Sequence, residues 1–131
     1  MYQIGDILHF QHYFFTDTNT SAAHFALIIL PPEIMDYVNN VLCAVITSKV
    51  TKRFALLLRC DDYGCFTKDS YVCLDRRDIN ALSDVSARRQ PVGRLKKSDV
   101  KKCFRILQAM YYSQQDVWMM AVIIREWKKV R

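Results

Sequence analysis

The sequence of 131 residues contains little glycine and little proline, three of each, and no repeat or low-complexity segment. Linkers between domains are rich in such residues, so their scarcity indicates one domain over residues 1–131. The longest apolar run, 117–124, has eight residues, whereas a membrane-spanning helix needs about 20. The N-terminal residues lack the basic start and apolar stretch of a signal peptide. We therefore expect a cytoplasmic protein without membrane contact.

Closely spaced cysteine pairs are also absent. There are five cysteines but no Cys-x2-Cys pair, which structural zinc sites usually contain. The odd number and the missing export signal indicate reduced thiols, and we expect no metal and no other cofactor. Cys43, Cys73 and Cys103 are predicted to be small buried hydrophobes. A zinc site formed by Cys60, Cys65, Cys73 and a histidine is the alternative.

Lysine and arginine are missing from the first 48 positions, which contain four acidic residues. All 19 Lys and Arg residues therefore lie in 49–131, with the remaining nine acids. This asymmetry predicts a polyanion or an acidic protein as partner. The lysines of 96–102 fit a solvated helix face. The pairs Arg76-Arg77 and Arg88-Arg89 lie outside that helix and are better candidates for contact with phosphate.

Short apolar stretches at close spacing predict five strands. They cover residues 4–15, 25–30, 41–47, 54–59 and 70–74. The polar stretch 16–21 is predicted to be a loop. Residues 79–85 fit a strand or a turn, and residues 90–95 a loop with a short extended piece.

The last third of the chain is predicted to be helical. Apolar residues recur at helical spacing at Val100, Cys103, Phe104, Leu107 and Tyr111. Ser98 is the expected N-cap, ahead of the acidic Asp99. A second helix is predicted for residues 115–130, and a strand is the alternative for 117–124. Because that segment is apolar all round it must be buried, which suggests packing across a dimer.

Together these elements predict a mainly β protein with C-terminal helices, in the α+β class. The strands would form a small, strongly bent antiparallel sheet or barrel that the helices close.

Five short segments of the chain occur in a recognisable order. They are Gly5-Asp6-Ile7, residues 24–29, Ile46-Thr47-Ser48, residues 70–75 and Gly93-Arg94-Leu95. In order and spacing they resemble the MazF/PemK (Kid) family, ribonucleases of bacterial toxin–antitoxin pairs. The resemblance covers residues 4–110 and implies a small SH3-like antiparallel barrel of the CcdB/PemK-like kind. Residues 111–131 would be a C-terminal helical extension beyond the usual end of the family.

The resemblance implies metal-independent cleavage of single-stranded RNA, in which the substrate's own 2′-hydroxyl attacks the adjacent phosphorus. The implied catalytic residues are His24, Asp75, Thr47 and Arg77. The implied RNA-binding residues are Ser48, Lys49, Lys52, Arg53 and Arg76. A homodimer and an acidic antitoxin partner are implied as well.

The residue types suit this chemistry on their own terms. Imidazole exchanges protons near neutral pH, so His24 fits acid–base work. The hydroxyls of Thr47 and Ser48 can donate to a phosphate. Asp75 could orient a cation or accept a proton, and it equally fits an ion pair with a neighbouring arginine. Candidates for stacking on unpaired bases are Tyr63, Phe66 and Tyr71, although such aromatics more often belong to a core or its rim.

Two positions depart from the family pattern. His24 stands where the family usually has arginine, and Cys73 stands where some members have a catalytic arginine. These replacements support a second hypothesis, a non-catalytic member of the same fold that binds nucleic acid or poisons a protein target such as gyrase. A third hypothesis is an interaction module whose apolar segment 117–124 binds a partner.

Overall fold

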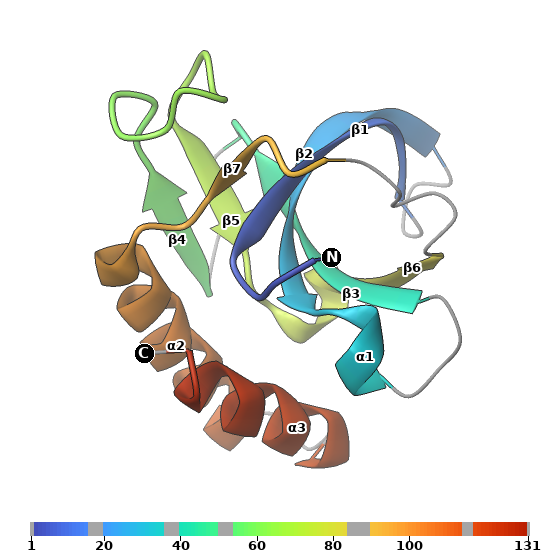
Figure 1. Cartoon of the computed structure of the whole chain (residues 1–131), viewed down its shortest axis with the longest axis vertical. Helices are drawn as coiled ribbons and strands as arrows, with labels where there is room; N and C mark the ends of the chain where they lie inside the picture. The colour runs from blue at the N-terminus through green and yellow to red at the C-terminus, as the bar shows by residue number, and fades with distance from the viewer. Residues whose placement is uncertain are drawn as a thin grey trace.

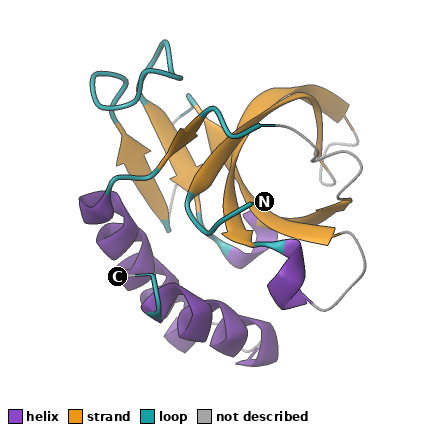
Figure 2. Cartoon of the chain, in the orientation of Figure 1, coloured by secondary structure: helices purple, strands orange, loops and turns teal. Residues whose placement is uncertain are grey.

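The computed structural model describes residues 2–15, 20–35, 40–49, 54–83, 90–113 and 117–130. Within this part of the chain, seven strands form one antiparallel sheet that curls into a half-barrel, with C-terminal helices along one side (Figure 1). Figure 2 shows the separation of strands and helices in space. The predicted α+β class, with a bent antiparallel sheet and C-terminal helices, is confirmed.

The elements follow one another in an order close to the predicted one. The strands are β1 (Asp6–Phe15), β2 (Thr20–Leu30), β3 (Asn40–Thr47), β4 (Ala55–Leu58), β5 (Ser70–Cys73), β6 (Ile79–Ser83) and β7 (Gly93–Arg94). The helices are α1 (Pro32–Met35), α2 (Lys97–Ser113) and α3 (Val117–Lys128), with a 3₁₀ turn, η1 (Arg76–Asp78), before β6. None of the helices in the described ranges has both the length and the apolar composition to cross a bilayer.

Strand β3 is the centre of the sheet, whose order is β4-β5-β3-β2-β1-β7. One edge of β3 pairs with β2, and the other edge is shared by two strands. Ile46 pairs with Val72 of β5, whereas Ala44 pairs with Ile79 of β6. The intervening residues 74–78 leave the ladder, and residues 76–78 form η1. Residues 79–83 pair with β3, so they are a strand, which is one of the two predicted alternatives.

The hairpin of β1 and β2 is longer than predicted. Thr20 pairs with Phe15 and Ser21 with Phe14, so these two polar residues belong to β2 and not to a loop. The ladder uses backbone groups, which polar residues supply as well as apolar ones do. The rest of the predicted loop, 16–19, lies outside the described residues.

Helix α2 starts earlier than predicted, because a tertiary contact replaces the expected N-cap. The helix begins at Lys97, so Ser98 lies in its first turn. The backbone N–H of Lys96 donates to the Tyr63 hydroxyl at 3.0 Å, and the Lys96 carbonyl accepts from Asp99 and Val100. Tyr63, 33 residues away in sequence, therefore helps to satisfy the end groups of this helix.

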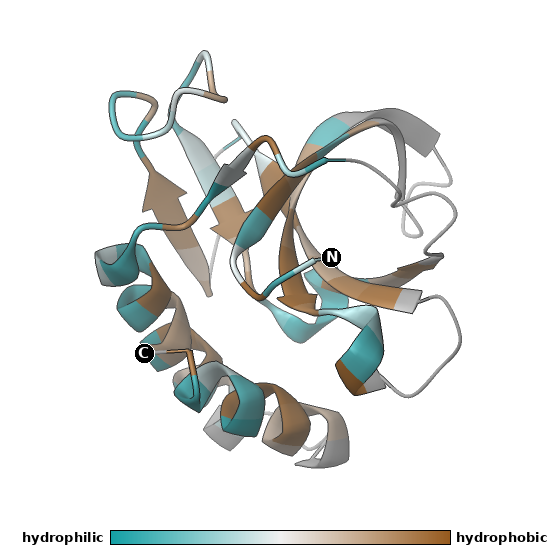
Figure 3. Ribbon diagram, viewed as in Figure 1, coloured by the Kyte–Doolittle hydropathy of each residue, from teal (hydrophilic) through white to brown (hydrophobic). Residues whose placement is uncertain are grey.

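Residues 25–30 of β2 and 41–46 of β3 are apolar on both faces, and Figure 3 shows hydrophobic residues on the sheet and on the helices. One face contributes Leu27 and Ile29 of β2 to a cluster that continues into α2 and α3. The other face contributes Ala26 and Ile28, which pack with Leu8, Phe10, Val41, Cys43, Val45 and Cys73. Since side chains alternate across a strand, these uninterrupted apolar runs are buried on both sides.

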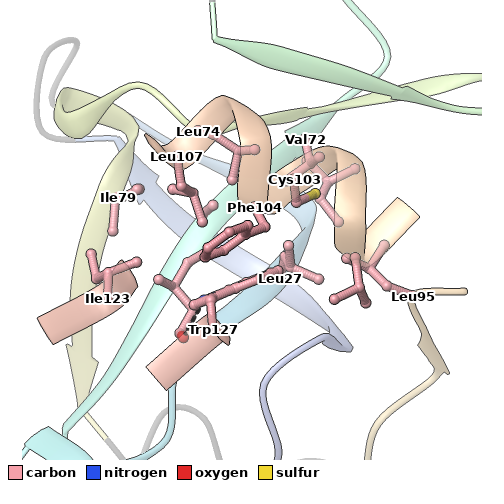
Figure 4. Close-up of a cluster of buried hydrophobic side chains, with 14 of the residues drawn as sticks. Leu27, Val72, Leu74, Ile79, Leu95, Cys103, Phe104, Leu107, Ile123 and Trp127 are labelled. Carbon is pink, nitrogen blue, oxygen red and sulfur yellow. Dashed lines mark hydrogen bonds between the residues drawn. The ribbon is translucent and has the colours of Figure 1, made fainter. Parts of the chain in front are cut away.

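Helix α3 is anchored to the sheet by Trp127, whose side chain is fully buried. Figure 4 shows it in one cluster with Phe104 of α2 and Leu27 of β2. Its indole Nε1–H donates to the backbone oxygen of Ile29 at 2.9 Å. Met120 and Ile123 are also fully buried within the chain's own core. Residues 117–124 are thus helical, with Met120 and Ile123 in the chain's own core and Ala121 exposed, and the packing of this segment across a dimer stays a prediction.

We expect Trp127→Phe to lower the free energy of unfolding by about 2–4 kcal/mol. The smaller ring leaves space in the core, and the Ile29 carbonyl loses its donor while it stays buried. Urea denaturation measures the change. Phe104→Leu is the control, since it removes aromatic volume without removing a hydrogen bond, and it should cost less. An equal or larger loss in the control would contradict the role of the indole hydrogen bond.

Candidate functional site

An open cavity of about 270 Å³ lies between β2, the end of β3 and the loop that precedes β5. Its polar lining consists of His24, Ser48, Thr67, Lys68 and Ser70, and its apolar walls are Phe25, Ile46 and Phe66. We call it the His24 cavity. An imidazole, an ammonium group and several hydroxyls are therefore gathered beside aromatic rings, and two of these residues, His24 and Ser48, are among the predicted site residues.

His24 is held by the neighbouring strand. Its Nδ1 lies 3.0 Å from the backbone oxygen of Ile46 on β3. A carbonyl oxygen can only accept, so Nδ1 carries the proton in this contact. In the neutral ring the lone pair is then on Nε2, the tautomer that a general base requires.

The end of β3 is shaped by Thr47, whose Oγ1 accepts a hydrogen bond from the backbone N–H of Lys49 at 3.2 Å. This turn leaves Ser48 and Lys49 exposed, with Ser48 in the lining of the cavity. Thr47 itself is half-buried and is not part of that lining. Its observed role is to set the turn that presents Ser48.

The loop before β5 and the first residue of that strand supply three cavity residues that the sequence pattern did not single out. Thr67 and Lys68 are exposed, and Ser70 is buried. The Ser70 hydroxyl donates to the Lys68 carbonyl at 3.0 Å, which fixes the backbone of the loop. The only signal in the sequence was a polar segment between two predicted strands, which indicates a loop but not its position.

Asp75 is the cap of η1, since its carboxylate accepts from the backbone N–H of Arg77 at 3.3 Å. Arg76 donates from Nη1 to the Ile79 carbonyl at 3.4 Å, and the exposed Arg77 lies 3.9 Å from Asp78. These residues follow β5 at the end away from Thr47. Asp75 is four residues beyond Tyr71, the partner of Thr47, which corresponds to a separation on the order of 10 Å along the strand.

The structure thus does not bring Asp75, Arg76 and Arg77 to the His24 cavity, and their predicted roles in catalysis and RNA binding stay predictions. Lys52, Arg53 and the pair Arg88-Arg89 lie outside the described residues.

A second open cavity, of about 560 Å³, shares Phe25 with the His24 cavity. Its lining consists of His9, Phe25, residues 62–65 and residues 92–94. We call it the His9 cavity. The Phe25 ring lies 4.9 Å from the His9 ring and 4.9 Å from the Phe66 ring, measured between centroids. Phe25 therefore forms a wall common to both cavities.

The loop that lines both cavities is fastened to α2 by Tyr63. The Tyr63 hydroxyl donates to the buried carboxylate of Asp99 at 2.5 Å and accepts from the Lys96 backbone. Burial, together with the hydrogen bond to Asp99, raises the pKa of Tyr63 above its usual range. The Lys96 ammonium lies 5.9 Å from the centre of the Tyr63 ring and 3.5 Å from Asp62. The position of the loop therefore depends on the start of α2.

Four of the five cysteines have a raised thiol pKa, which disfavours the nucleophilic thiolate. All five are free thiols, and Cys43, Cys73 and Cys103 are buried as predicted. Burial raises the pKa of Cys43 and of Cys103 to about 12, so both stay protonated at neutral pH. The pKa of Cys65 is also raised by burial, and that of Cys60 is raised by its hydrogen bond to Asp69. Among the described residues no three His, Cys, Asp or Glu side chains are grouped as metal ligands.

Comparisons with known proteins leave the family open. No protein-family model matches the sequence, and no curated protein matches it. An assignment of function therefore has to be based on the chemistry of the two cavities.

The Tyr63–Asp99 hydrogen bond predicts a particular dependence of stability on pH. The pKa of Tyr63 is higher in the folded than in the unfolded state, so its contribution is complete below about pH 10 and is lost as the pH rises further. We expect Tyr63→Phe to be less stable at pH 8, by about 1–3 kcal/mol, because buried Asp99 loses a donor. Urea denaturation between pH 8 and 11.5 should show this difference shrinking above pH 10. A constant difference would be evidence against the interaction.

The capping role of Asp75 predicts that the effect of replacing this residue on stability depends on which side chain takes its place. Asn accepts the hydrogen bond of a cap almost as well as Asp, whereas Ala cannot. We expect Asp75→Ala to lower the free energy of unfolding by about 1 kcal/mol, and Asp75→Asn to leave it nearly unchanged. Thermal unfolding of both variants, followed by circular dichroism, is sufficient. Equal losses would show that the carboxylate charge, and not the cap, matters for stability.

Proposed function

We propose that the protein is a toxin-type, metal-independent endoribonuclease that cleaves single-stranded RNA. The observation that carries this proposal is the His24 cavity, in which an imidazole, a lysine ammonium and the hydroxyls of Ser48 and Thr67 line one open space. The resemblance to the MazF/PemK family supports it, with the curled sheet as that family's SH3-like barrel. In this proposal the protein is a homodimer with an acidic antitoxin as its partner.

Cleavage of RNA by its own 2′-hydroxyl needs three kinds of groups. A base must remove the hydroxyl proton, an acid must protonate the leaving 5′-oxygen, and donors must stabilise the charge on the phosphoryl oxygens. His24 performs proton transfer, through Nε2 when the ring is neutral. Lys68 and the Ser48 hydroxyl hold the phosphate, and their exposure gives a flexible strand access to them. DNA lacks the attacking hydroxyl and stays intact.

The surface charge suits a polyanionic substrate. Near the cavity, Lys49 and Lys68 are exposed, and so are three acids of the loop before β5, Asp61, Asp62 and Asp69. The first two turns of α2 expose Lys97, Lys101 and Lys102, while the acid of that segment, Asp99, is buried against Tyr63. This excess of positive charge favours RNA in encounter, and it gives an acidic antitoxin a surface to neutralise.

A non-catalytic nucleic-acid-binding protein of the same fold is the second candidate. The capping role of Asp75 favours it, because this carboxylate is engaged at η1, and no carboxylate is present in the described lining of the His24 cavity. A cavity with one imidazole and one ammonium group can bind a phosphate without cutting beside it.

Incubation of the purified protein with a long single-stranded transcript in EDTA tests the proposal. We expect discrete cuts that leave 2′,3′-cyclic phosphate and 5′-hydroxyl ends. His24→Asn should reduce the rate at least about 100-fold, since the amide cannot transfer a proton. The same amide can still donate to Ile46, so the melting temperature should stay near that of the wild type.

Glu33→Gln is the matched control, because it removes an exposed titratable group on α1, outside the cavity. It should cut RNA at nearly the wild-type rate. Intact RNA across pH 5 to 9, with salt-sensitive binding, would favour the second candidate. Full activity of His24→Asn would remove His24 from the mechanism.

A further inference from the structure

We propose that the His9 cavity binds one unpaired base of the RNA whose backbone lies in the His24 cavity. This inference rests on the proposed contact with RNA and assigns a second site. Its first support is continuity, because the two cavities share Phe25 as a wall. Adjacent parts of one nucleotide chain can therefore contact the same residue from the two cavities.

The second support is the difference in lining chemistry. The His24 cavity is rich in hydroxyls and carries an ammonium group, which suits a phosphate. The His9 cavity is walled largely by flat or apolar side chains, those of His9, Phe25, Tyr63, Cys65 and Val92, and its charged lining residues are Asp62 and Arg94. Its volume of about 560 Å³ falls in the range of roughly 300–1,000 Å³ that is usual for small-ligand sites. Stacking on aromatic rings is the common way in which proteins hold unpaired bases.

The third support is a donor fixed at the rim of the His9 cavity. Asp6, 2 % exposed, accepts from Arg94 Nε at 3.0 Å and from the Gln3 backbone at 2.9 Å. The Arg94 side chain is nevertheless 58 % exposed. A buried carboxylate therefore orients a guanidinium that reaches solvent at the mouth of the cavity. The guanidinium of Arg94 has a planar face that can stack and N–H groups that can donate to base edges. It therefore adds hydrogen bonding to the stacking surface.

Gly64 offers a way to block this cavity without disturbing the fold. It belongs to the lining, a Cβ at this position would meet no atom within 4 Å, and its φ is not positive. A leucine side chain at position 64 therefore fits without a clash and adds bulk at the lining of the cavity. Ala109→Leu is the matched control, since it adds bulk at an exposed position of α2 that lines neither cavity.

The experiment measures binding, so it does not depend on cleavage. Fluorescently labelled nine-residue oligomers of U, A, C and G, and an abasic ribose-phosphate oligomer of the same length, are titrated with the protein and followed by anisotropy. We expect wild type and Ala109→Leu to bind at least one base-containing oligomer about tenfold more tightly than the abasic one. Gly64→Leu should bind all five with the affinity of the abasic oligomer. His9→Ala, which removes a stacking surface, should reduce the preference as well.

The outcomes separate the two proposals. If Gly64→Leu and His9→Ala both keep the full preference for bases, the His9 cavity is not the base site, whatever the cleavage assay shows. If the preference is lost in these variants but wild type does not cut RNA, the base site is supported and the ribonuclease proposal fails. If wild type binds none of the oligomers, the base site is overturned, and the cleavage assay alone decides the ribonuclease proposal.

Discussion

The constraint on which the rest of the structure depends is that residues 25–30 of β2 and 41–46 of β3 are apolar on both faces. A sheet of this kind has to be covered twice. One face is covered by α2 and α3, which complete the larger cluster. On the other face the curl of the sheet brings side chains of β1, β2 and β3 together in the smaller cluster. The bend of the sheet and the helical layer thus both bury hydrophobic residues of the same two strands, one on each face.

The same packing positions both cavities. Trp127 and Phe104 fix the helices on the sheet, and the start of α2 in turn holds Tyr63 through Asp99. Tyr63 belongs to the loop whose other residues line both cavities, so the geometry of this surface is set by the helical layer behind it. The C-terminal helices are therefore part of the core and also determine where the loop lies.

Local periodicity in the sequence was enough to locate most of the elements. Apolar runs located the strands, and helical spacing at Val100, Cys103 and Leu107 located α2. The start of this helix was misplaced because the satisfying group, the Tyr63 hydroxyl, comes from a distant loop. For the same reason the sequence did not predict that Lys68 and His24 line one cavity, since no local pattern encodes which loop meets which strand. Conversely Asp75, chosen for its chemical type, is a cap, a role that only backbone geometry reveals.

The closing of the sheet by residues far apart in sequence also has a kinetic consequence. Ile29 and Trp127 are 98 residues apart, and Asp6 and Arg94 are 88 apart. Chains whose contacts join residues far apart in sequence have a high contact order and fold slowly. The long loops between such residues lose conformational entropy before the contacts that stabilise the fold are made. Until those loops close, the apolar strand β2 lacks its cover and is open to pairing with another chain. Dilute conditions or a chaperone should therefore improve the yield of folded protein.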